Sequence, residues 1–470
     1  EREKVAEWLF SKEFDNNGSP KGIGLSLWRF GIGAGGNNVK NESLWTWRFS
    51  DCFMNTDYTY NWSRQSGQLW FLNKAREYDV DNILAYAYSP PYFMSANGKT
   101  TSLKSRPSNL NIKDGITNDY ALFLANVVTH FEEEGFNLKY LSPFNEPEWD
   151  WSNGLAEGSP ATNKELYELI ICLDSILKKK GSNVKLAIGE SGDIRYLTRA
   201  LPVDINRSNK MDFFFNPSSQ FYIGDLDHVM PLISGHSYHT VWPIDTLIKL
   251  RAEIPERIKQ VNEEIKYWQT EYCIMQANDD IKGGWKRDLG INTALYVARI
   301  IHHDLTIASA SSWQWWLAAS HVDYKGSLIY LEKNGRVSKG PDDELYESLK
   351  YGGNVKDSKL MWVLGNYSRF IRPGMIRIKS EINPTQSLID QSYNLMASSY
   401  LDIETGKVIS VLINYGEKEI KTKLRINNRV ARKGTNAYIT DSNKSLGYKH
   451  FSSKYIIVPA RSVITLINDI

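Results

Sequence analysis

The chain has 470 residues with 56 basic and 54 acidic side chains, so its charge is nearly balanced. A chain of this length exceeds one ordinary hydrophobic core, which favours two domains. No run of Lys and Arg could hold a nucleic-acid backbone, and no apolar run approaches the roughly 20 residues that span a bilayer. We therefore expect neither a nucleic-acid partner nor a transmembrane segment.

The 3 cysteines, Cys52, Cys172 and Cys273, lack the paired spacing of a metal site and allow at most one disulfide. No signal peptide is recognisable at Glu1, and a processed chain would look the same. Aromatic residues are the unusual feature, with 15 Trp and 26 Tyr. Most of these rings should fill the core, but several lie beside candidate catalytic carboxylates.

The apolar pattern alternates between the helical and the strand period along the first two thirds of the chain. It predicts helices over residues 1–14, 67–78, 118–134, 163–180, 244–261 and 292–306. Short apolar runs predict strands near residues 25, 85, 141, 187, 235, 269 and 312. Alternating strands and helices indicate a parallel α/β fold, and polar residues at the strand ends favour a (β/α)8 TIM barrel over an open sheet.

The strand count is one short, because a closed barrel of this type needs eight strands and the pattern predicts seven. The chain opens on a helix, so we expect the first strand to precede Glu1. From about residue 356 onward, short alternating segments separated by turns indicate an antiparallel β-sandwich. The predicted domains are a catalytic barrel over residues 1–355 and a sandwich over 356–470.

The segment Gly31-Ile-Gly-Ala-Gly-Gly36 matches the dinucleotide-binding pattern G-x-G-x-x-G. Such a site needs a helix to begin directly after the glycines, because the helix N-terminus holds the pyrophosphate. Only Asn-Asn-Val-Lys-Asn follows, which is not a helix-forming run. We therefore predict no nicotinamide or flavin cofactor.

Two glutamates share one setting, each at the end of an apolar strand among aromatic residues. Glu146 follows the run at 138–141, and Pro147 should end that strand because proline cannot donate to a sheet ladder. Glu271 closes the strand at 267–271. Barrel enzymes place their chemistry at these strand ends. The pair predicts acid–base chemistry on a sugar, although each glutamate alone could be a solvated strand-end residue.

Two histidine pairs raise the possibility of a metal site. His236 and His239 lie on one strand end, and His302 and His303 are adjacent in a predicted helix, where they point to different faces. No H-E-x-x-H motif occurs, so we predict no metal. The pattern favours instead that Tyr238 hydrogen-bonds a carboxylate and that His236 lines the site.

The last predicted strand is rich in tryptophan. By the strand period of two, Trp313 and Trp315 share one face and Trp316 takes the other. Two inward rings would form a platform for sugar, whereas core filling suits Trp316 better. Trp149 and Trp151 could add stacking surface next to Glu146.

Together, five segments resemble glycoside hydrolase family 30: Phe144-Asn-Glu-Pro, Thr270-Glu-Tyr-Cys, His236-Ser-Tyr, Trp313-Gln-Trp-Trp-Leu and Leu364-Gly-Asn-Tyr-Ser-Arg-Phe-Ile-Arg-Pro-Gly374. The resemblance covers essentially the whole chain. It implies a retaining (β/α)8 barrel with an attached β-sandwich.

The resemblance also implies a role for each matching site residue. Glu146 would be the general acid/base and Glu271 the nucleophile, while Asn145 would contact the hydroxyl next to the anomeric carbon. Arg29 and Tyr238 would be partners of the nucleophile. The remaining expected substrate-binding residues are Tyr88, Trp149, His236, His239, Trp313 and Trp315.

The run at 144–151 most resembles the β-1,6-galactanase-like branch, so we expect an endo-β-1,6-galactanase acting on a plant-type polysaccharide outside the cytoplasm, at the cell surface, in the periplasm or secreted. A β-1,6-glucanase or xylanase of the same family is the alternative. Rivals of other classes are a catalytically silent carbohydrate-binding protein and a metal-dependent hydrolase. A cation in the cleft, for which Arg195 and Lys282 are the candidates, would instead suggest an acidic sugar. The sequence leaves the oligomeric state open.

Overall fold

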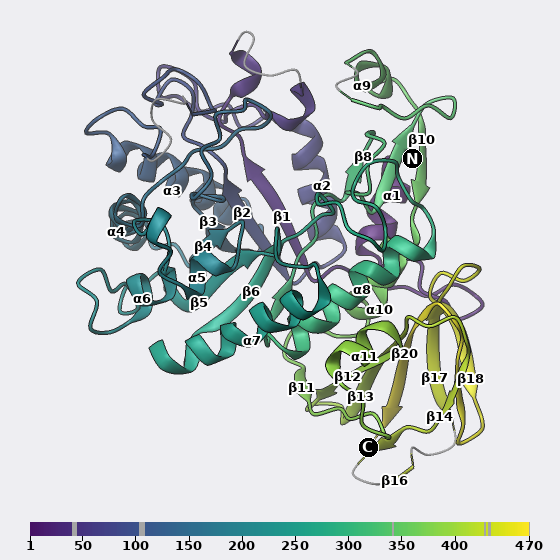
Figure 1. Cartoon of the computed structure of the whole chain (residues 1–470). Helices are drawn as coiled ribbons and strands as arrows, with labels where there is room; N and C mark the ends of the chain where they lie inside the picture. Colours follow the sequence, from purple (N-terminus) through teal and green to yellow (C-terminus); the bar gives the residue numbers. More distant parts are fainter. Residues whose placement is uncertain (40–44, 103–108, 341–342, 427–428, 431–433, 470) are drawn as a thin grey trace.

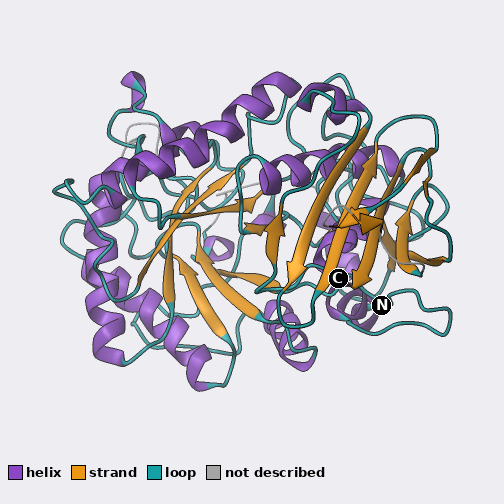
Figure 2. Cartoon of the chain, turned by 90° about the horizontal axis from the view of Figure 1, so that it is seen from below, coloured by secondary structure: helices purple, strands orange, loops and turns teal. Residues whose placement is uncertain are grey.

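The computed structural model describes residues 1–39, 45–102, 109–340, 343–426, 429–430 and 434–469. A curled parallel sheet surrounded by helices occupies one side of the molecule, and antiparallel sheets occupy the other (Figures 1 and 2). The predicted α/β barrel-like part and the predicted antiparallel part are therefore both present.

Seven parallel strands pair in chain order and form the curled sheet. They are β1 (Leu27–Ile32), β2 (Asn82–Ala87), β3 (Leu138–Ser142), β4 (Lys185–Ser191), β5 (Val229–His236), β6 (Lys266–Glu271) and β7 (Ser312–Trp313). All seven lie where the sequence predicts strands. Among the described residues β1 and β7 do not pair with each other. The expectation of an eighth strand before Glu1 stays a prediction.

Helices connect these strands and cover the outer face of the sheet (Figure 2). The predicted ones are α1 (Arg2–Phe10), α2 (Ser66–Glu77), α3 (Thr117–Glu133), α4 (Asn163–Lys180), α7 (Ile244–Val261) and α8 (Ile291–Thr306). The short helices α5 (Arg195–Thr198) and α6 (Lys210–Phe215) were not predicted. Helix α1 ends at Phe10 rather than Phe14, because Ser11 is already extended and Phe14 forms a β-bridge with Pro20.

Local sequence explains the ends of α4 well. Thr162 caps the first turn by accepting from the Glu165 backbone N–H, and the Glu165 side chain accepts in return from the Thr162 backbone. This reciprocal capping box satisfies two donors that the helix itself cannot. At the other end Gly181 adopts the left-handed conformation (φ 68°), which glycine reaches without a steric cost.

The inside of the curled sheet is filled by its own side chains. Leu84, Ala187, Leu232 and Trp268, from four different strands, form one buried cluster there. The interior is therefore a packed core and not a pore, as in barrels of this type. Functional groups must lie at an end of the strands.

In the part of the chain that the structure describes, five further elements follow β7 before the C-terminal sheet. A three-stranded sheet contains β8 (Ala319–Ser320), β9 (Ile329–Glu332) and β10 (Asn354–Asp357), with α9 (Asp343–Leu349) inserted before β10. Helix α10 (Lys359–Ser368) comes next and packs against α8. The predicted domain boundary between residues 355 and 356 falls within β10, so the division into 1–355 and 356–470 stays a prediction.

The C-terminal part is built on a six-stranded antiparallel sheet. Its strands, in spatial order, are β11 (Ile376–Ile378), β12 (Leu395–Asp402), β13 (Lys407–Asn414), β20 (Ser462–Asp469), β17 (Thr435–Thr440) and β18 (Gly447–Phe451). Helix α11 (Leu388–Tyr393) precedes β12, and two small sheets pair β14 (Ile420–Thr422) with β19 (Ile456–Val458) and β15 (Arg425–Ile426) with β16 (Arg429–Val430). Ile456 and Val458 of β19 share a buried cluster with Leu412 and Ile439 of the larger sheet. The small sheet thus forms a second layer.

Helices α8 and α10 join the two parts. Met361 and Val363 of α10 belong to the same apolar core as the barrel helices and as Ile413 and Val463 of the antiparallel sheet. Within the described ranges, no helix combines the length and apolarity needed to cross a membrane. The three cysteines are all free thiols.

Candidate active site

Glu146 lies in a strained loop rather than at the strand end that we predicted. Strand β3 stops at Ser142 because Pro143 has no N–H with which to extend the ladder. Glu146 adopts φ 42°, in the left-handed region, and its N–H donates to the Glu190 carbonyl at 2.8 Å. Non-glycine residues in this region cost about 1–3 kcal/mol each and concentrate at functional sites.

Glu271 is the last residue of β6, as predicted, and two donors hold its carboxyl group. Arg29 Nη1, from β1, donates to Oε2 at 2.7 Å. The Tyr238 phenol, from the segment after β5, donates to Oε1 at 2.9 Å. The Arg29 guanidinium also lies 3.9 Å above the Tyr86 ring, which fixes its plane. A cation and a hydroxyl donor both favour the ionised carboxylate.

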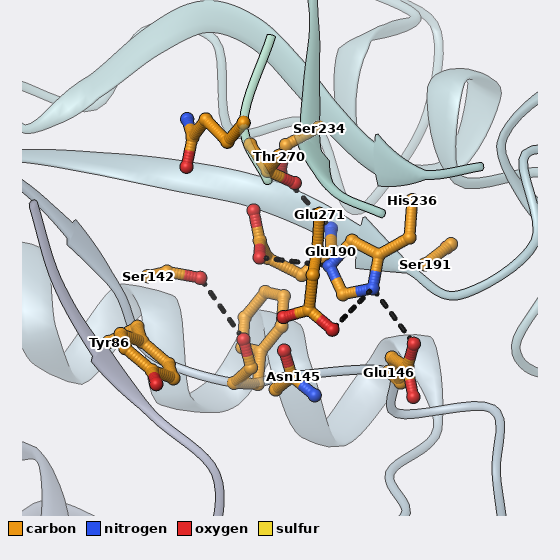
Figure 3. A network of polar contacts seen from close by, with 12 residues as sticks. Tyr86, Ser142, Asn145, Glu146, Glu190, Ser191, Ser234, His236, Thr270 and Glu271 are labelled. Carbon is orange, nitrogen blue, oxygen red and sulfur yellow. Dashed lines mark hydrogen bonds and ion pairs between the residues drawn. The ribbon is translucent and has the colours of Figure 1, made fainter. Parts of the chain in front are cut away.

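His236 lies between three carboxyl groups (Figure 3). Its Nδ1 is 2.8 Å from Glu146 Oε1 and 3.9 Å from Glu271 Oε1, and its Nε2 is 3.4 Å from Glu190 Oε2. Burial alone would lower the pKa of His236, but the surrounding carboxylates Glu271, Glu146 and Glu190 raise it to about 10. The ring is therefore an imidazolium that donates from both nitrogens.

Glu190, near the end of β4, is the functional residue that the sequence interpretation missed. Its carboxylate accepts from Arg29 Nη2 at 3.2 Å as well as from His236, and the residue is fully buried. Burial would raise the pKa of Glu190, but the His236 hydrogen bond and the Arg29 charge lower it to about 2. The rule used for Glu146 and Glu271, an acidic residue at a barrel strand end, would have found Glu190 as well.

The carboxyl group of Glu146 has the opposite tendency. Burial raises its pKa, and the charges of Glu271 and Glu148 add to this effect, while the hydrogen bond from His236 opposes it. The surroundings of Glu146 thus favour its protonated form, whereas the Arg29 and Tyr238 donors hold the Glu271 carboxyl group in place.

The two predicted catalytic carboxyl groups are close together. One side-chain oxygen of Glu146, one of Glu271 and one ring nitrogen of His236 all lie within 4.8 Å of one another. This trio is also the one group among the described residues with the spacing of a metal site. An imidazolium has no lone pair for a metal, and Arg29 already neutralises Glu271. The absence of a catalytic metal stays a prediction.

A cleft of about 1240 Å³ opens over the two glutamates. Its lining includes both of them and the predicted residues Tyr88, Asn145, Trp149, Tyr238 and His239. Trp151, which the sequence suggested as stacking surface, lines it too, and so do Trp47, Arg48 and Trp316, none of which was predicted to bind sugar. His236 and Arg29 are not in the lining, but His236 contacts Glu146 and lies 3.9 Å from Glu271, and Arg29 contacts Glu271.

Trp313 and Trp315 differ from the expected sugar platform. They stack on each other with ring centroids 6.1 Å apart, but neither belongs to the cleft lining. Trp313 Nε1 donates to Asp304 of α8 at 2.8 Å, so this ring faces the helix layer. Strand β7 pairs with β6 only through Ser312 and Trp313, and the alternation of faces therefore does not continue to Trp316. Sugar contacts by Trp313 and Trp315 stay predictions.

The cationic candidates Arg195 and Lys282 are likewise not in the cleft lining. Arg195 pairs with Asp193. Among the described residues, only a short 3-10 helix (Gly36–Asn38) begins at the end of the glycine-rich segment at 31–36. Its Ala34 and Gly36 N–H groups donate to the Glu157 carboxylate of the same chain at 3.3 and 3.0 Å, so a side chain fills this potential anion site.

Enzymes that hydrolyse glycosidic bonds use such a pair of close carboxyl groups, one protonated and one ionised. The comparison with known families places the chain in that class. It belongs to O-glycosyl hydrolase family 30, whose family model matches residues 1–330. The protein is therefore a glycoside hydrolase with a carbohydrate substrate.

Solved structures agree over almost the whole chain. A conserved exported protein from Bacteroides fragilis is 33% identical, with a TM-score of 0.91 over 99% of this chain and 92% of that one. The catalytic domain of a family 30 xylanase from Talaromyces cellulolyticus (19% identical, TM-score 0.66, 100% and 92% covered) and an endo-β-1,6-glucanase (15% identical, TM-score 0.61, 100% and 86% covered) share the fold.

One curated relative is similar over a shorter segment. An exo-β-1,6-galactobiohydrolase from Bifidobacterium longum subsp. longum is 29% identical over 122 residues, which are 25% of this chain. The match spans only 8% of that protein's length.

Proposed function

We propose that this protein is a retaining β-glycoside hydrolase in which Glu146 is the acid/base and Glu271 the nucleophile. The observation that carries the proposal is that one carboxyl oxygen of Glu146 lies within 4.8 Å of one carboxyl oxygen of Glu271. Retaining enzymes hold their carboxyl groups about 5–5.5 Å apart, whereas inverting enzymes leave about 6.5–9.5 Å for a water molecule.

In the first step Glu271 attacks the anomeric carbon while Glu146 gives its proton to the glycosidic oxygen. The bond between the anomeric carbon and that oxygen breaks, and an ester to Glu271 forms. In the second step Glu146, now ionised, takes a proton from water as the water oxygen attacks the same carbon. The ester bond breaks, and both carboxyl groups return to their starting states.

The surrounding charges support this division of labour. Arg29 and Tyr238 aim Glu271 and stabilise its charge in the free enzyme. The His236 imidazolium, 2.8 Å from Glu146, stabilises the carboxylate that Glu146 becomes after the first step. Glu190 contacts both Arg29 and His236 and therefore keeps both cations in place. Asn145 is proposed to contact the hydroxyl next to the anomeric carbon.

We propose β-1,6-galactan as the substrate, cleaved outside the cytoplasm. Support comes from the segment at 144–151, from the β-1,6-galactobiohydrolase relative and from the exported protein with the similar structure. A 1,6-linked chain has an extra rotatable bond, so stacking surfaces suit it better than a long rigid groove. Trp149, Trp151 and Trp316 line the cleft and provide such surfaces.

Product release from β-1,6-galactan, β-1,6-glucan and xylan, measured side by side, tests the substrate. Faster cleavage of glucan or xylan would overturn the galactan assignment. Proton NMR of the first-formed anomer tests the mechanism separately, and an α-anomer would overturn retention. Activity should survive treatment with a chelator, which would inactivate a metal-dependent hydrolase. If the protein hydrolyses no β-glycan in a broad screen, the result would favour a catalytically silent carbohydrate-binding protein.

A further inference from the structure

A fully buried ion pair lies next to the proposed acid/base. Lys210, the first residue of α6, places Nζ 3.2 Å from Oε2 of Glu148, and both side chains are 0% exposed. Moving two charges out of water costs several kcal/mol per ion, so a buried pair adds little to stability by itself. Its position calls for another explanation, because Glu148 follows Glu146 by two residues.

The pair fastens two loops together. Lys210 Nζ also donates to Ser191 Oγ at 2.6 Å, and Glu148 Oε1 accepts from the Asp193 N–H at 3.3 Å. Arg207 donates to the Glu148 carbonyl at 2.9 Å. The loop that follows β3 and the turn at residues 190–193, which begins with the last two residues of β4, are thereby held in one arrangement.

That turn presses directly on the proposed acid/base. A Cβ atom added at Gly192 would lie 2.8 Å from Glu146 Oε1 and 2.5 Å from Trp149 Nε1, so any larger residue would force these two side chains to shift. The Glu190 carbonyl accepts the Glu146 N–H. The place of the Glu146 carboxyl group therefore depends on where the turn at 190–193 lies.

We propose that Lys210 is a positioning residue for Glu146, acting through Glu148 and Ser191, and that its charge also neutralises Glu148 beside the acid/base. This inference rests on the proposed role of Glu146. The charges that face Glu146 are His236 from β5, Glu271 from β6 and Glu148 from its own loop. Those that face Lys210 are Glu148, Arg207 and Asp204, and its ammonium lies 5.8 Å from the Tyr196 ring.

The sign of the electrostatic effect can be tested with Glu148→Gln. The Glu148 carboxylate contributes to the raised pKa of Glu146. Removing this carboxylate while Lys210 stays charged should lower the pKa of Glu146. The basic limb of the kcat/KM profile should then move to lower pH by about one unit. This is the size expected when one charge is left unneutralised at an effective dielectric constant of about 20. Lys210→Met should move the same limb to higher pH.

Positioning should show in the dependence on the leaving group. We expect Lys210→Met to lower kcat about tenfold or more on the natural glycan, part of the roughly 10²–10⁴-fold that general acid catalysis supplies. Dinitrophenyl glycosides of the released sugar need little protonation, so their cleavage should change less than about twofold. A purely structural defect would reduce both substrates by one common factor.

Arg199→Met is the matched control, since the Arg199–Glu253 pair is partly exposed and contacts neither glutamate. It should leave both the pH profile and the leaving-group dependence unchanged. Thermal unfolding checks that each variant folds. If Lys210→Met does not fold, the Glu148→Gln variant and the double variant decide, because Gln preserves the shape of Glu148.

The result that overturns the inference is an unshifted basic limb in Glu148→Gln, or an equal loss on both substrates. Glu146→Ala, measured in parallel, separates this failure from failure of the proposed function. If Glu146→Ala spares dinitrophenyl glycosides, its role stands and only the inference about Lys210 fails. If Glu146→Ala loses both substrates equally, the acid/base assignment itself is wrong.

Discussion

Glu146 and Glu271 lie in one cleft but in opposite surroundings. Glu271 ends a regular strand and receives a guanidinium and a phenol. Glu146 lies in a strained loop, pressed by Gly192, where burial and two neighbouring carboxylates raise its pKa. The comparison teaches that their surroundings can prepare two identical side chains for different chemical tasks: in the proposed mechanism the anion ends a regular strand and the proton donor lies in a loop.

The largest effect should come from removing the function of each glutamate in turn. We expect Glu271→Gln to lower turnover by about 10⁴-fold or more on every substrate, because no covalent intermediate can form. Glu146→Ala should cost about 10²–10⁴-fold on the glycan but little on dinitrophenyl glycosides. Steady-state kinetics on both substrates checks this. If Glu146→Ala lost activity equally on the glycan and on dinitrophenyl glycosides, the proposed difference in role between Glu146 and Glu271 would be wrong.

Arg29 is a cation that contacts both Glu271 and Glu190. Arg29→Met leaves Glu271 and Glu190 buried without their cation, and breaking such a pair costs about 3–5 kcal/mol. We expect a large drop in Tm together with a loss of kcat. Denaturant unfolding measures the first and single-turnover kinetics the second. Wild-type stability in Arg29→Met would show that the two carboxylates do not depend on this cation.

His236 contacts Glu146, and its loss of a proton should appear in the pH dependence of the free energy of unfolding. Burial lowers the pKa of His236, but three carboxylates raise it to about 10. A raised pKa stabilises the native state fully below the unfolded value of about 6.5, and this contribution is lost as pH rises through about 10. The free energy of unfolding of wild type should therefore lose its advantage over that of His236→Asn between pH 6.5 and 10, by an amount on the order of a few kcal/mol. The difference in Tm between the two proteins should shrink in the same range.

Glu190 provides the opposite sign within the same cluster. Its pKa is lowered to about 2, so its contribution is present above about pH 4.5 and is lost as pH falls through about 2. Thermal unfolding of wild type, His236→Asn and Glu190→Gln across pH 2–10 checks both windows. A Tm difference between wild type and His236→Asn that stays constant from pH 6.5 to 10 would contradict a protonated His236.

The sequence predicts much of this arrangement because the strand ends are local features. Apolar periodicity and strand-ending residues placed six helices and all seven parallel strands. The strand-end rule located Glu271 and Tyr238, and the family resemblance implied Arg29, although the strand before Glu146 ends earlier, at Pro143. The Asn-Glu-Pro segment still marked the loop that carries Glu146.

What the sequence did not reveal depends on contacts between distant segments. The strand-end rule applies to Glu190, but its contacts with Arg29, across 161 positions, and with His236, across 46, form no recognisable motif. Lys210 meets Glu148 across 62 positions, in a helix too short for the apolar pattern to predict. Trp313 illustrates the remaining difficulty, because the strand period assigns faces only while the chain stays in the sheet.

The tryptophans after β7 allow a smaller comparison, between one ring in the cleft and one against α8. We expect Trp316→Ala to raise KM for the glycan about tenfold, since stacking surface is lost while both glutamates stay in place. Trp313→Phe should leave KM unchanged and lower Tm slightly, because its hydrogen bond to Asp304 is lost. A raised KM in Trp313→Phe together with an unchanged KM in Trp316→Ala would instead identify Trp313 as the sugar platform.

The smallest expected effect concerns Arg48, which lines the cleft together with the cations Arg64 and Lys350. A free cation there would suggest an acidic sugar, yet the Arg48 guanidinium lies 5.3 Å from the Trp316 ring and 5.9 Å from the Trp47 ring. Contacts with aromatic faces occupy such a cation without any carboxylate. For a neutral galactan we therefore expect Arg48→Gln to change kcat/KM by less than about threefold, mainly by loosening Trp316. Comparing wild type and Arg48→Gln on unsubstituted and glucuronate-bearing β-1,6-galactan checks this. A preference for the glucuronate-bearing chain that disappears in Arg48→Gln would identify an acidic substrate and would replace the neutral galactan, while the roles of Glu146 and Glu271 would stand.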